Sequence, residues 1–406
     1  MSPRHRILRD IPFVLPFADR VHLFRTFIQL DKDALGYGAE RDIILTERQR
    51  LTVRRDHVFE DGFKQLSKLG GTLLRSRLAI SFISELGLDE AGVDGGGVWK
   101  EFFSLLSKEA FHPDSGLFLT TDHDHALYPN PAATSPLDLR KFEFVGRVVG
   151  KALYDGLLVG AAFAPFFINH WLQRSNLFDD LPSLDPELYK HLVYLKNMPA
   201  GEVEELGVTF TVDVKDRGQT RTLELMRGGA HTPVTSANRI KYTYLVANFK
   251  LNHLIQRQCR AFLSGLSDLI RPEWLQLFNQ TELLHLVSGS DEPIDIADMR
   301  AHTIYGGEYS AGHRVIRNFW QVAEELGTED RRLLLRFITS STRAPLLGFK
   351  ELVPALCIRP GGDDQEWLPT ASTCVNLLKL PVYRDLGTLR EKLLYSIRSG
   401  VGFELS

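Results

Sequence analysis

The sequence predicts an α+β protein with two compact parts of unequal size. A chain of 406 residues is longer than one hydrophobic core usually needs, at roughly 100–200 residues per domain. Apolar residues recur at helical spacing through most of the chain before residue 288, whereas helical and strand-like segments alternate after residue 293. The polar sequence SGSDEP at 288–293 separates the two patterns and is typical of a domain boundary.

The composition excludes several classes of protein. Hydrophobic and charged residues make up 44% and 24% of the chain, which is ordinary for a globular protein. Lys and Arg number 48 against 51 Asp and Glu, so a net charge of −3 provides no broad basic surface. The longest apolar run, 157–168, is too short to cross a bilayer. We therefore expect neither a nucleic-acid partner nor a membrane partner.

Residue types that bind metals are present but not at ligand spacing. The three cysteines, Cys259, Cys357 and Cys374, are too far apart in sequence for a C-x-x-C zinc motif and form no disulfide framework. The sequence DHDH at 122–125 lacks a second ligand pair, so a solvated loop is favoured. We expect no metal site, and a reducing compartment such as the cytoplasm, the nucleus or both.

Helices dominate the chain before residue 288. After a mixed N-terminal arm at 1–19, apolar spacing predicts helices at 19–30, 56–69 and 74–86. Three glycines at 95–97 mark a turn that leads into a further helix.

The segment 142–155 is predicted to be a mostly buried helix. One charged residue recurs every fourth position, and apolar residues fill the other faces. The sequence GRVVGK at 146–151 resembles a phosphate-binding loop, but it has one residue too few between its glycines and lies inside the helix. Gly146 and Gly150 are therefore predicted to allow close helix packing.

The remaining elements follow in chain order. Residues 208–214 alternate between apolar and polar, which predicts a half-buried strand paired with 222–226. Long helical patterns then cover 240–269 and 273–286. After the boundary we expect helices at 315–326 and 330–338, strands at 355–359 and 375–380, and a last helix that begins at Thr388 with Glu391 completing a capping box.

Cys374 differs from the other two cysteines. Cys259 and Cys357 lie among apolar residues and are expected to pack in the interior. Cys374 follows the small residues Thr-Ala-Ser-Thr, and such a turn exposes a thiol and surrounds it with backbone N–H groups. On composition alone, a nucleophile and an inert loop cysteine are equally supported.

Several segments together resemble the HECT-type ubiquitin ligases. They stand in family order and cover roughly residues 20–406. The Ala-Ser-Thr-Cys sequence and the C-terminal GFELS are most similar to the proteasome-associated branch. The matching segments are GLDEAGVDGGGVWKEFF (87–103), FEFVGRVVGKALYDGLLV (142–159), LDPELYKHLVYLKN (184–197), ELLHLVSGS (282–290), TIYGGEYS (303–310), RNFWQVAEEL (317–326), LPTASTCVNLLKLP (368–381) and GFELS (402–406).

The resemblance implies a bilobal HECT domain. It would consist of a mainly helical N-lobe with small β elements at 20–288, a hinge at 289–292, and a smaller α/β C-lobe at 293–406. A conjugating enzyme carrying ubiquitin as a thioester would dock on the N-lobe. The chain would take the ubiquitin onto its own cysteine and pass it to lysines of protein substrates. No cofactor would be needed, and the proteasome is a further candidate partner.

The resemblance also assigns roles to individual residues. Cys374 would be the ubiquitin acceptor, supported by Thr373 and by Arg343 in TSSTRAP, although a structural contact explains Arg343 equally well. Phe403 would assist transfer to lysine. Ser372 stands where many family members have histidine, and a hydroxyl is no general base at neutral pH. The family's exposed apolar docking groove falls on Leu188, Leu192, Met198, Leu206, Val208, Tyr242 and Val246.

Two other functions were compared with this one. A cysteine hydrolase acting on ubiquitin chains would need a paired histidine and an oxyanion-hole motif, and neither signature lies beside Cys374. A silent ubiquitin-binding scaffold would not need the intact cysteine motif and tail. Cleavage of a ubiquitin chain would distinguish the hydrolase, and failure to form a covalent adduct would distinguish the scaffold.

Overall fold

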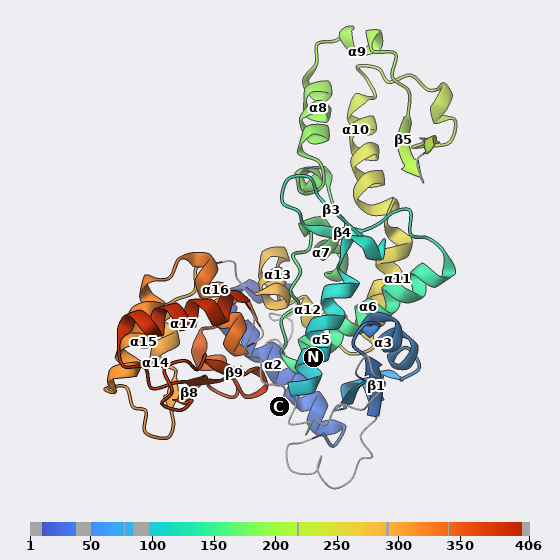
Figure 1. Cartoon of the computed structure of the whole chain (residues 1–406). Helices are drawn as coiled ribbons and strands as arrows, with labels where there is room; N and C mark the ends of the chain where they lie inside the picture. Colours follow the sequence, from blue (N-terminus) through green and yellow to red (C-terminus); the bar gives the residue numbers. More distant parts are fainter. Residues whose placement is uncertain are drawn as a thin grey trace. The chain divides into compact units, whose positions relative to one another are not determined.

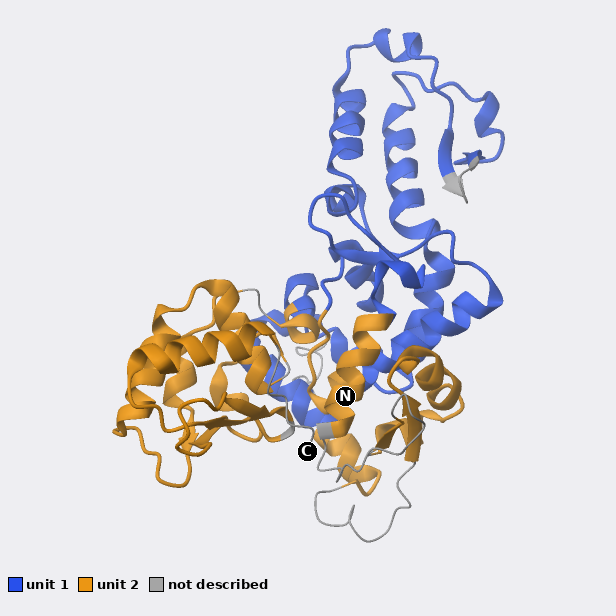
Figure 2. Ribbon diagram, viewed as in Figure 1, with its two compact units in different colours: residues 1–28, 110–151, 161–284 blue, residues 29–109, 152–160, 285–406 orange. Residues whose placement is uncertain are grey.

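The computed structural model describes residues 10–37, 50–76, 78–83, 97–216, 219–289, 292–339 and 341–399 (Figure 1). They fall into two compact units, blue and orange in Figure 2. The last change of unit, after residue 284, comes close to the boundary predicted at 288–293. The predicted lobes, hinge and arm stay predictions. Unit 1 takes residues 1–28, 110–151 and 161–284, and unit 2 takes 29–109, 152–160 and 285–406.

Unit 1 is mainly helical, with two small antiparallel sheets. Strand β3 pairs with β4, and β5 pairs with β6, which confirms the predicted pairing of 208–214 with 222–226. Four helices of the described part, α2, α5, α6 and α13, contain residues of both units. The helices and strands are α2 (Phe17–Ala34), β3 (Phe118–Thr120), β4 (Leu127–Pro129), α6 (Pro136–Asp155), α7 (Pro165–Trp171), α8 (Pro186–Asn197), α9 (Glu202–Glu205), β5 (Thr211–Asp216), β6 (Gln219–Glu224), α10 (Arg239–Asn248), α11 (Gln256–Ser267), α12 (Pro272–Leu275) and α13 (Gln280–Ser288).

A capping box fixes the start of α6. The backbone N–H of Asp138 donates to Ser135 Oγ at 3.1 Å, and the N–H of Ser135 donates to the Asp138 carboxylate at 3.0 Å. Pro136 occupies the first helical position, where a missing N–H costs nothing. The helix predicted at 142–155 is therefore confirmed and begins six residues earlier.

Helices α6 and α11 cross at glycines. A Cβ atom placed on Gly146 would lie 2.0 Å from the carbonyl oxygen of Phe262, and one on Gly265 would lie 1.8 Å from that of Glu143. A Cβ on Gly150 would approach the carbonyl oxygen of Leu266 to 3.1 Å. The predicted packing role of Gly146 and Gly150 is thus confirmed, and the two backbones meet without side chains between them.

The helix predicted at 240–269 is interrupted. Helix α10 ends at Asn248, a π-helical turn follows at Phe249–His253, and α11 begins at Gln256. Within the turn, Asn252 Nδ2 donates to the carbonyl oxygen of Asn176 at 3.0 Å, and Asn252 Oδ1 accepts from the N–H of Asn176 at 3.1 Å. π-helical turns are rare and occur mostly as single turns within α-helices, and here the turn carries the asparagine that makes this pair.

Unit 2 begins with a parallel strand pair that the sequence did not predict. The helix expected at 74–86 is wrong, because α4 ends at Arg75 and 79–83 form strand β2 beside β1. Alternate residues of β2 are buried, and a two-residue period is typical of a strand with one buried face. Residues 84–86 lie outside the described part. The elements before residue 152 are β1 (Arg50–Arg54), α3 (Val58–Leu66), α4 (Gly71–Arg75), β2 (Ala79–Ile83) and α5 (Gly97–Ala110).

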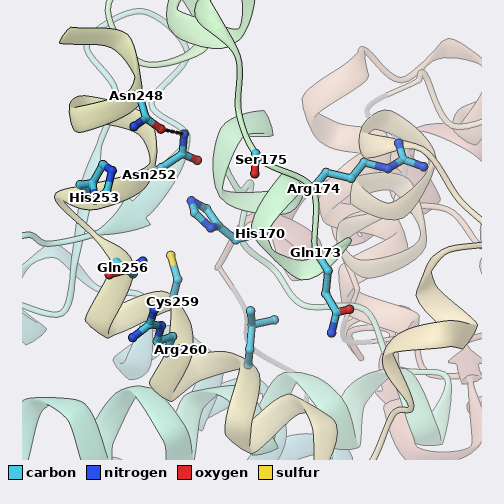
Figure 3. A pocket seen from close by; sticks show the side chains of 11 residues that line it. His170, Gln173, Arg174, Ser175, Asn248, Asn252, His253, Gln256, Cys259 and Arg260 are labelled. Carbon is cyan, nitrogen blue, oxygen red and sulfur yellow. Dashed lines mark hydrogen bonds between the residues drawn. The ribbon is translucent and has the colours of Figure 1, made fainter. Parts of the chain in front are cut away.

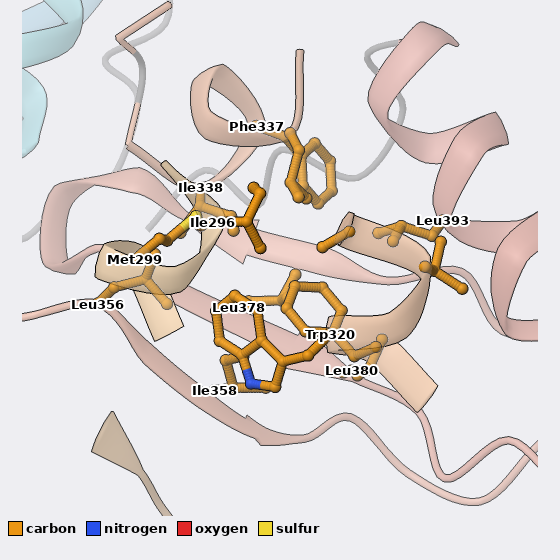
Figure 4. Close-up of a cluster of buried hydrophobic side chains, with 14 of the residues drawn as sticks. Ile296, Met299, Trp320, Phe337, Ile338, Leu356, Ile358, Leu378, Leu380 and Leu393 are labelled. Carbon is orange, nitrogen blue, oxygen red and sulfur yellow. The ribbon is translucent and has the colours of Figure 1, made fainter. Parts of the chain in front are cut away.

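The C-terminal segment of unit 2 is a four-stranded sheet with helices. The strand order is β7-β8-β10-β9, with β10 parallel to β8 and antiparallel to β9. Figure 4 shows its core, where Trp320 and Phe337 pack with Ile358 and Leu378 of the sheet. The predicted helices and strands are confirmed here. The elements are α14 (Ile296–Ala301), β7 (Ile304–Tyr305), α15 (Arg314–Glu325), α16 (Thr328–Thr339), β8 (Cys357–Pro360), β9 (Thr370–Ser372), β10 (Leu377–Leu380) and α17 (Leu386–Ser399).

Helix α17 starts two residues before the predicted position. The capping box expected from Thr388 and Glu391 is wrong, because Asp385 provides the cap. Its carboxylate accepts the backbone N–H and the hydroxyl of Thr388, both at 2.9 Å. These bonds hold the pKa of Asp385 below its usual value.

Candidate functional site

Cys374 lies in a short loop between two antiparallel strands. Ser372 of β9 pairs with Leu377 of β10, so residues 373–376 form a four-residue hairpin loop. Thr373–Val375 form a 3-10 turn, and Asn376 follows with φ 50° and ψ 43°, a left-handed conformation. Hairpin loops of this length are most often built around such a turn. The strand expected from residue 375 therefore begins at Leu377.

The surroundings of the loop differ from one residue to the next. Cys374 is the middle residue of the 3-10 turn. Val375 is 42% exposed, Thr373 is half-buried and Ser372 is buried. The small residues Thr370–Ser372 form strand β9 instead of the predicted turn, which begins only at Thr373. The accessibility of the Cys374 thiol and the role of Thr373 stay predictions.

Asn376 ties the loop to the segment that leads into β8. Its side chain is buried, and Nδ2 donates to the carbonyl oxygen of Pro354 at 2.7 Å. Its carbonyl oxygen accepts the N–H of Cys357 at 2.9 Å. Asn376 is not among the residues expected from the sequence to act. The signal in the sequence was an asparagine between a small-residue turn and a strand, where the left-handed region favours Asn and Gly.

The other two cysteines occupy different environments. Cys259 is buried as predicted, and burial raises the pKa of its thiol far above the ordinary value. Cys357 was also expected in the interior, but it is only half-buried. Its neighbour Ile358 points into the core, so the alternation of β8 directs Cys357 to the opposite face of the sheet.

Arg343 contacts the end of α13. Its Nη1 donates to the carbonyl oxygens of Ser288 at 2.8 Å and Gly289 at 3.2 Å. Gly289 has φ 79°, and its N–H donates to the backbone carbonyl oxygen of His285 at 2.8 Å. It therefore ends the helix in the left-handed conformation that glycine tolerates. Arg343 therefore has the structural contact weighed above, and its part in transfer stays a prediction. Residues 290–291 and Phe403 lie outside the described residues.

The docking-groove residues come together but are not all exposed. Leu188 and Leu192 lie on α8, and Tyr242 and Val246 lie on α10. These two helices lie side by side (Figure 1). Leu188, Val208 and Tyr242 are half-buried. The expectation of an exposed groove holds for Leu206, which is 49% exposed, and is wrong for the buried residues Leu192, Met198 and Val246, at 5%, 7% and 3%.

Packing explains the burial of Met198. It belongs to a small core with Leu195, Val203, Phe210 and Val234 beneath this surface. Two exposed aromatic side chains of α8 and α10, Tyr194 and Tyr244, were not expected from the sequence. Their signal was present, since each lies two residues from a buried apolar residue, Leu192 or Val246, and residues two apart on a helix do not share a face.

A polar surface pocket of about 400 Å³ lies in unit 1 (Figure 3). The Asn248–Asn252 hydrogen bond, 2.9 Å long, crosses one edge. His170 places Nε2 3.0 Å from the carbonyl oxygen of Leu251, and burial lowers the pKa of its imidazole. None of the residues assigned a role from the sequence lines this pocket.

In the described part of the chain, His, Cys, Asp and Glu side chains form no group of three or more that could hold a metal ion. The residues of the DHDH sequence at 122–125 are exposed. Among the same residues, no helix combines the length and apolar character that crossing a bilayer requires.

Comparison with known proteins gives a consistent result. A model of the HECT-domain (ubiquitin-transferase) family matches residues 104–406. A probable E3 ubiquitin protein ligase of Schizosaccharomyces pombe is 44% identical over 406 residues, covering 100% of this chain and 39% of its own length. Human ubiquitin-protein ligase E3B is 39% identical over 431 residues, covering 98% of this chain and 40% of its own.

A third relative is similar to the same extent. The E3 ubiquitin-protein ligase HUL5 of Saccharomyces cerevisiae is 41% identical over 414 residues, covering 98% of this chain and 45% of its own length. The chain thus spans about two fifths of the length of these curated relatives.

Proposed function

As the chain belongs to the HECT-domain (ubiquitin-transferase) family, we propose that it accepts ubiquitin as a thioester on Cys374 and transfers it to lysine side chains of protein substrates. The family match to residues 104–406 carries the proposal, because it includes the hairpin loop of residues 373–376. The neighbouring Val375, which is 42% exposed, supports a loop that a partner can approach.

The chemistry needs two acyl transfers. In the first, the Cys374 thiolate attacks the thioester carbonyl carbon at the ubiquitin C-terminus, and the thiolate of the conjugating enzyme leaves. In the second, a neutral lysine amine attacks the new thioester, Cys374 leaves as a thiolate and the nitrogen loses a proton. The first step exchanges one thioester for another, so a thiolate is a sufficient nucleophile and no ATP or metal is required. An ordinary thiol of pKa about 8.5 supplies a few per cent of thiolate at pH 7.

One loading assay tests the proposal. The chain is mixed with ubiquitin, an activating enzyme, ATP and a panel of conjugating enzymes, and the products are separated with and without thiol reductant. We expect an adduct one ubiquitin heavier that disappears on reduction. No adduct with any conjugating enzyme would favour a scaffold, and shortening of an added ubiquitin chain would favour a hydrolase.

We place the conjugating enzyme on the surface formed by α8, α10 and the segment after α9. Leu206→Asp is expected to reduce the loading rate about fivefold to tenfold at subsaturating conjugating enzyme, because an exposed apolar anchor is worth more than about 1 kcal/mol. Stability should change by less than about 0.5 kcal/mol, since Leu206 is 49% exposed. Loading kinetics and thermal unfolding measure the two effects.

Leu137→Asp is the matched control for this surface. Leu137 is 45% exposed and lies in the first turn of α6, where a carboxylate is tolerated. It should load at the wild-type rate. Equal loading by Leu206→Asp and the control would argue against this docking surface. Leu192→Asp is a poorer test, because the charge would be buried.

Phe403 is proposed to act in the second transfer. Phe403→Ala should form the thioester at the wild-type rate but lose isopeptide product about tenfold, corresponding to about 1.4 kcal/mol of transition-state stabilisation. A pulse-chase assay that follows adduct formation and then its discharge to lysine measures the two steps separately. Phe13→Ala, which removes a 72% exposed phenylalanine, is the control. Equal loss of both steps would indicate a folding defect instead.

The remaining expectations concern context. We propose a cytoplasmic or nuclear location, because the few cysteines fit a reducing compartment, and the proteasome as a further partner, on the resemblance of ASTC and GFELS to the proteasome-associated branch. Co-purification of the chain with proteasomes, compared with a chain ending at residue 401, would test the second point. Unchanged recovery would leave the GFELS segment without a role in that association.

A further inference from the structure

We propose that Asn376 is the positioning residue for the Cys374 thiol, holding the hairpin loop in the orientation from which the thiol meets the incoming thioester. The inference rests on the proposed function, since it gives Asn376 a role in the transfer of ubiquitin to Cys374. It adds a residue outside the set assigned above and explains why an asparagine, rather than an apolar residue, stands between the loop and β10.

The backbone of Asn376 is the first observation. Three described residues other than glycine have a positive φ, namely His125, Gln173 and Asn376. His125 and Gln173 are exposed, whereas Asn376 is 1% exposed. A residue in a sparsely populated conformation persists only when its surroundings hold it there, and such residues concentrate at functional sites. This one lies two positions after Cys374.

The contacts of Asn376 show what holds it. The side-chain Nδ2 donates to the carbonyl oxygen of Pro354 at 2.7 Å, and the carbonyl oxygen of Asn376 accepts the N–H of Cys357 at 2.9 Å. The N–H of Asn376 donates to the carbonyl oxygen of Thr373 at 3.4 Å. The first two bonds join the loop to the segment 354–357, which leads into the central strand pair of the sheet. The third closes the 3-10 turn that contains Cys374. One residue therefore connects the reactive turn to the rigid sheet.

The reaction needs this kind of restraint. The thiol and the thioester carbonyl belong to two separate proteins, and a misplacement of about 1 Å can cost about a hundredfold in rate. A loop of four residues has few other restraints, because Val375 is 42% exposed and its side chain has no hydrogen-bonding group. The buried amide of Asn376 supplies a directional bond where packing alone would leave the turn free to tilt.

Three substitutions separate the two contributions of Asn376. Asn376→Gly keeps the left-handed backbone but loses the amide, and Asn376→Asp keeps the shape but replaces the donor with an oxygen that faces the Pro354 carbonyl. Asn376→Ala loses both the amide and the conformational preference. The control is Asn130→Gly, which removes a similar 2.8 Å bond from an asparagine Nδ2 to the Gly116 carbonyl in a turn of unit 1.

Single-turnover loading from a charged conjugating enzyme is measured over a range of concentrations, together with alkylation of Cys374 by iodoacetamide and thermal unfolding. For Asn376→Gly and Asn376→Asp we expect the maximal loading rate to fall tenfold or more. The half-saturating concentration and the alkylation rate should stay within twofold of wild type, because a small reagent needs no fixed thiol orientation. Asn376→Ala should load at least as slowly, and Asn130→Gly should load normally.

Each contrary result has a distinct meaning. A maximal rate within twofold of wild type for Asn376→Gly or Asn376→Asp would overturn the positioning role. A parallel fall in loading, alkylation and melting temperature would also overturn it, because that pattern belongs to a merely structural residue. If wild type forms no reducible adduct, or if Cys374→Ala still forms one, the proposed function itself fails and the inference fails with it.

Discussion

Cys374→Ala will form no ubiquitin adduct, and Cys374→Ser will form one that survives thiol reductants. The chain contains three cysteines, so each can be removed in turn and the acceptor identified by elimination. Removal of the nucleophile leaves no sulfur to carry the acyl group, whereas a serine hydroxyl forms an oxyester that thiol exchange does not cleave readily. The measurement is the mobility of the adduct with and without reductant.

The other two cysteines are the matched controls. Cys259→Ala should load at the wild-type rate, because the Cys259 thiol is buried and burial raises its pKa, so that it holds almost no thiolate. Cys357→Ala is the stricter control, since Cys357 is half-buried and its N–H bonds to Asn376. If Cys374→Ala still forms a reducible adduct and Cys357→Ala does not, the acceptor is Cys357 on the neighbouring strand β8.

Gly146→Ala is expected to destabilise unit 1 by at least about 3 kcal/mol. The added methyl group would lie 2.0 Å from the carbonyl oxygen of Phe262, so α6 and α11 would have to separate along their crossing. Alanine gains about 1 kcal/mol over glycine as a helix former, which is too little to offset the clash. In a unit of this size the melting temperature should fall by about 6–12 °C.

Gly160→Ala is the control for this substitution. No atom lies within 4 Å of a Cβ placed on Gly160, and its φ is not in the left-handed region. Its melting temperature should stay within about 2 °C of wild type. If the melting temperature of Gly146→Ala equals that of the control, α6 and α11 do not cross as closely as described.

Local sequence patterns predicted the elements that depend on their own residues. The helices around 142–155 and 315–326 have regular apolar spacing, and their observed bounds agree to within six residues. The packing role of Gly146 could be predicted because its sequence motif lies inside a buried helix, whereas a phosphate-binding loop would follow a strand. The α+β class and the family were likewise evident from the order of the segments.

The errors arose where distant residues decide the outcome. Residues 79–83 form a strand because β1, about 29 positions earlier in register, pairs with them, and that pairing overrides a weak helical pattern. The buried state of Leu192 and Val246 depends on the packing of α8 against α10, which helical spacing cannot reveal. The cap of α17 was misplaced because Asp385, three residues before Thr388, accepts the N–H and the hydroxyl of Thr388 itself.

The hydrogen bonds between Asn176 and Asn252 have a consequence for the exchange of segments between related proteins. The two ends of the segment 177–248 meet within unit 1, because the side chain of Asn252 bonds to the backbone of Asn176 and Asn176 Nδ2 donates to Asn252 Oδ1. A segment whose two ends are held together at one point can be exchanged as a unit. On the docking surface proposed above, replacement of the whole segment by its counterpart from a relative is expected to change the choice of conjugating enzyme and to leave the remaining helices in register.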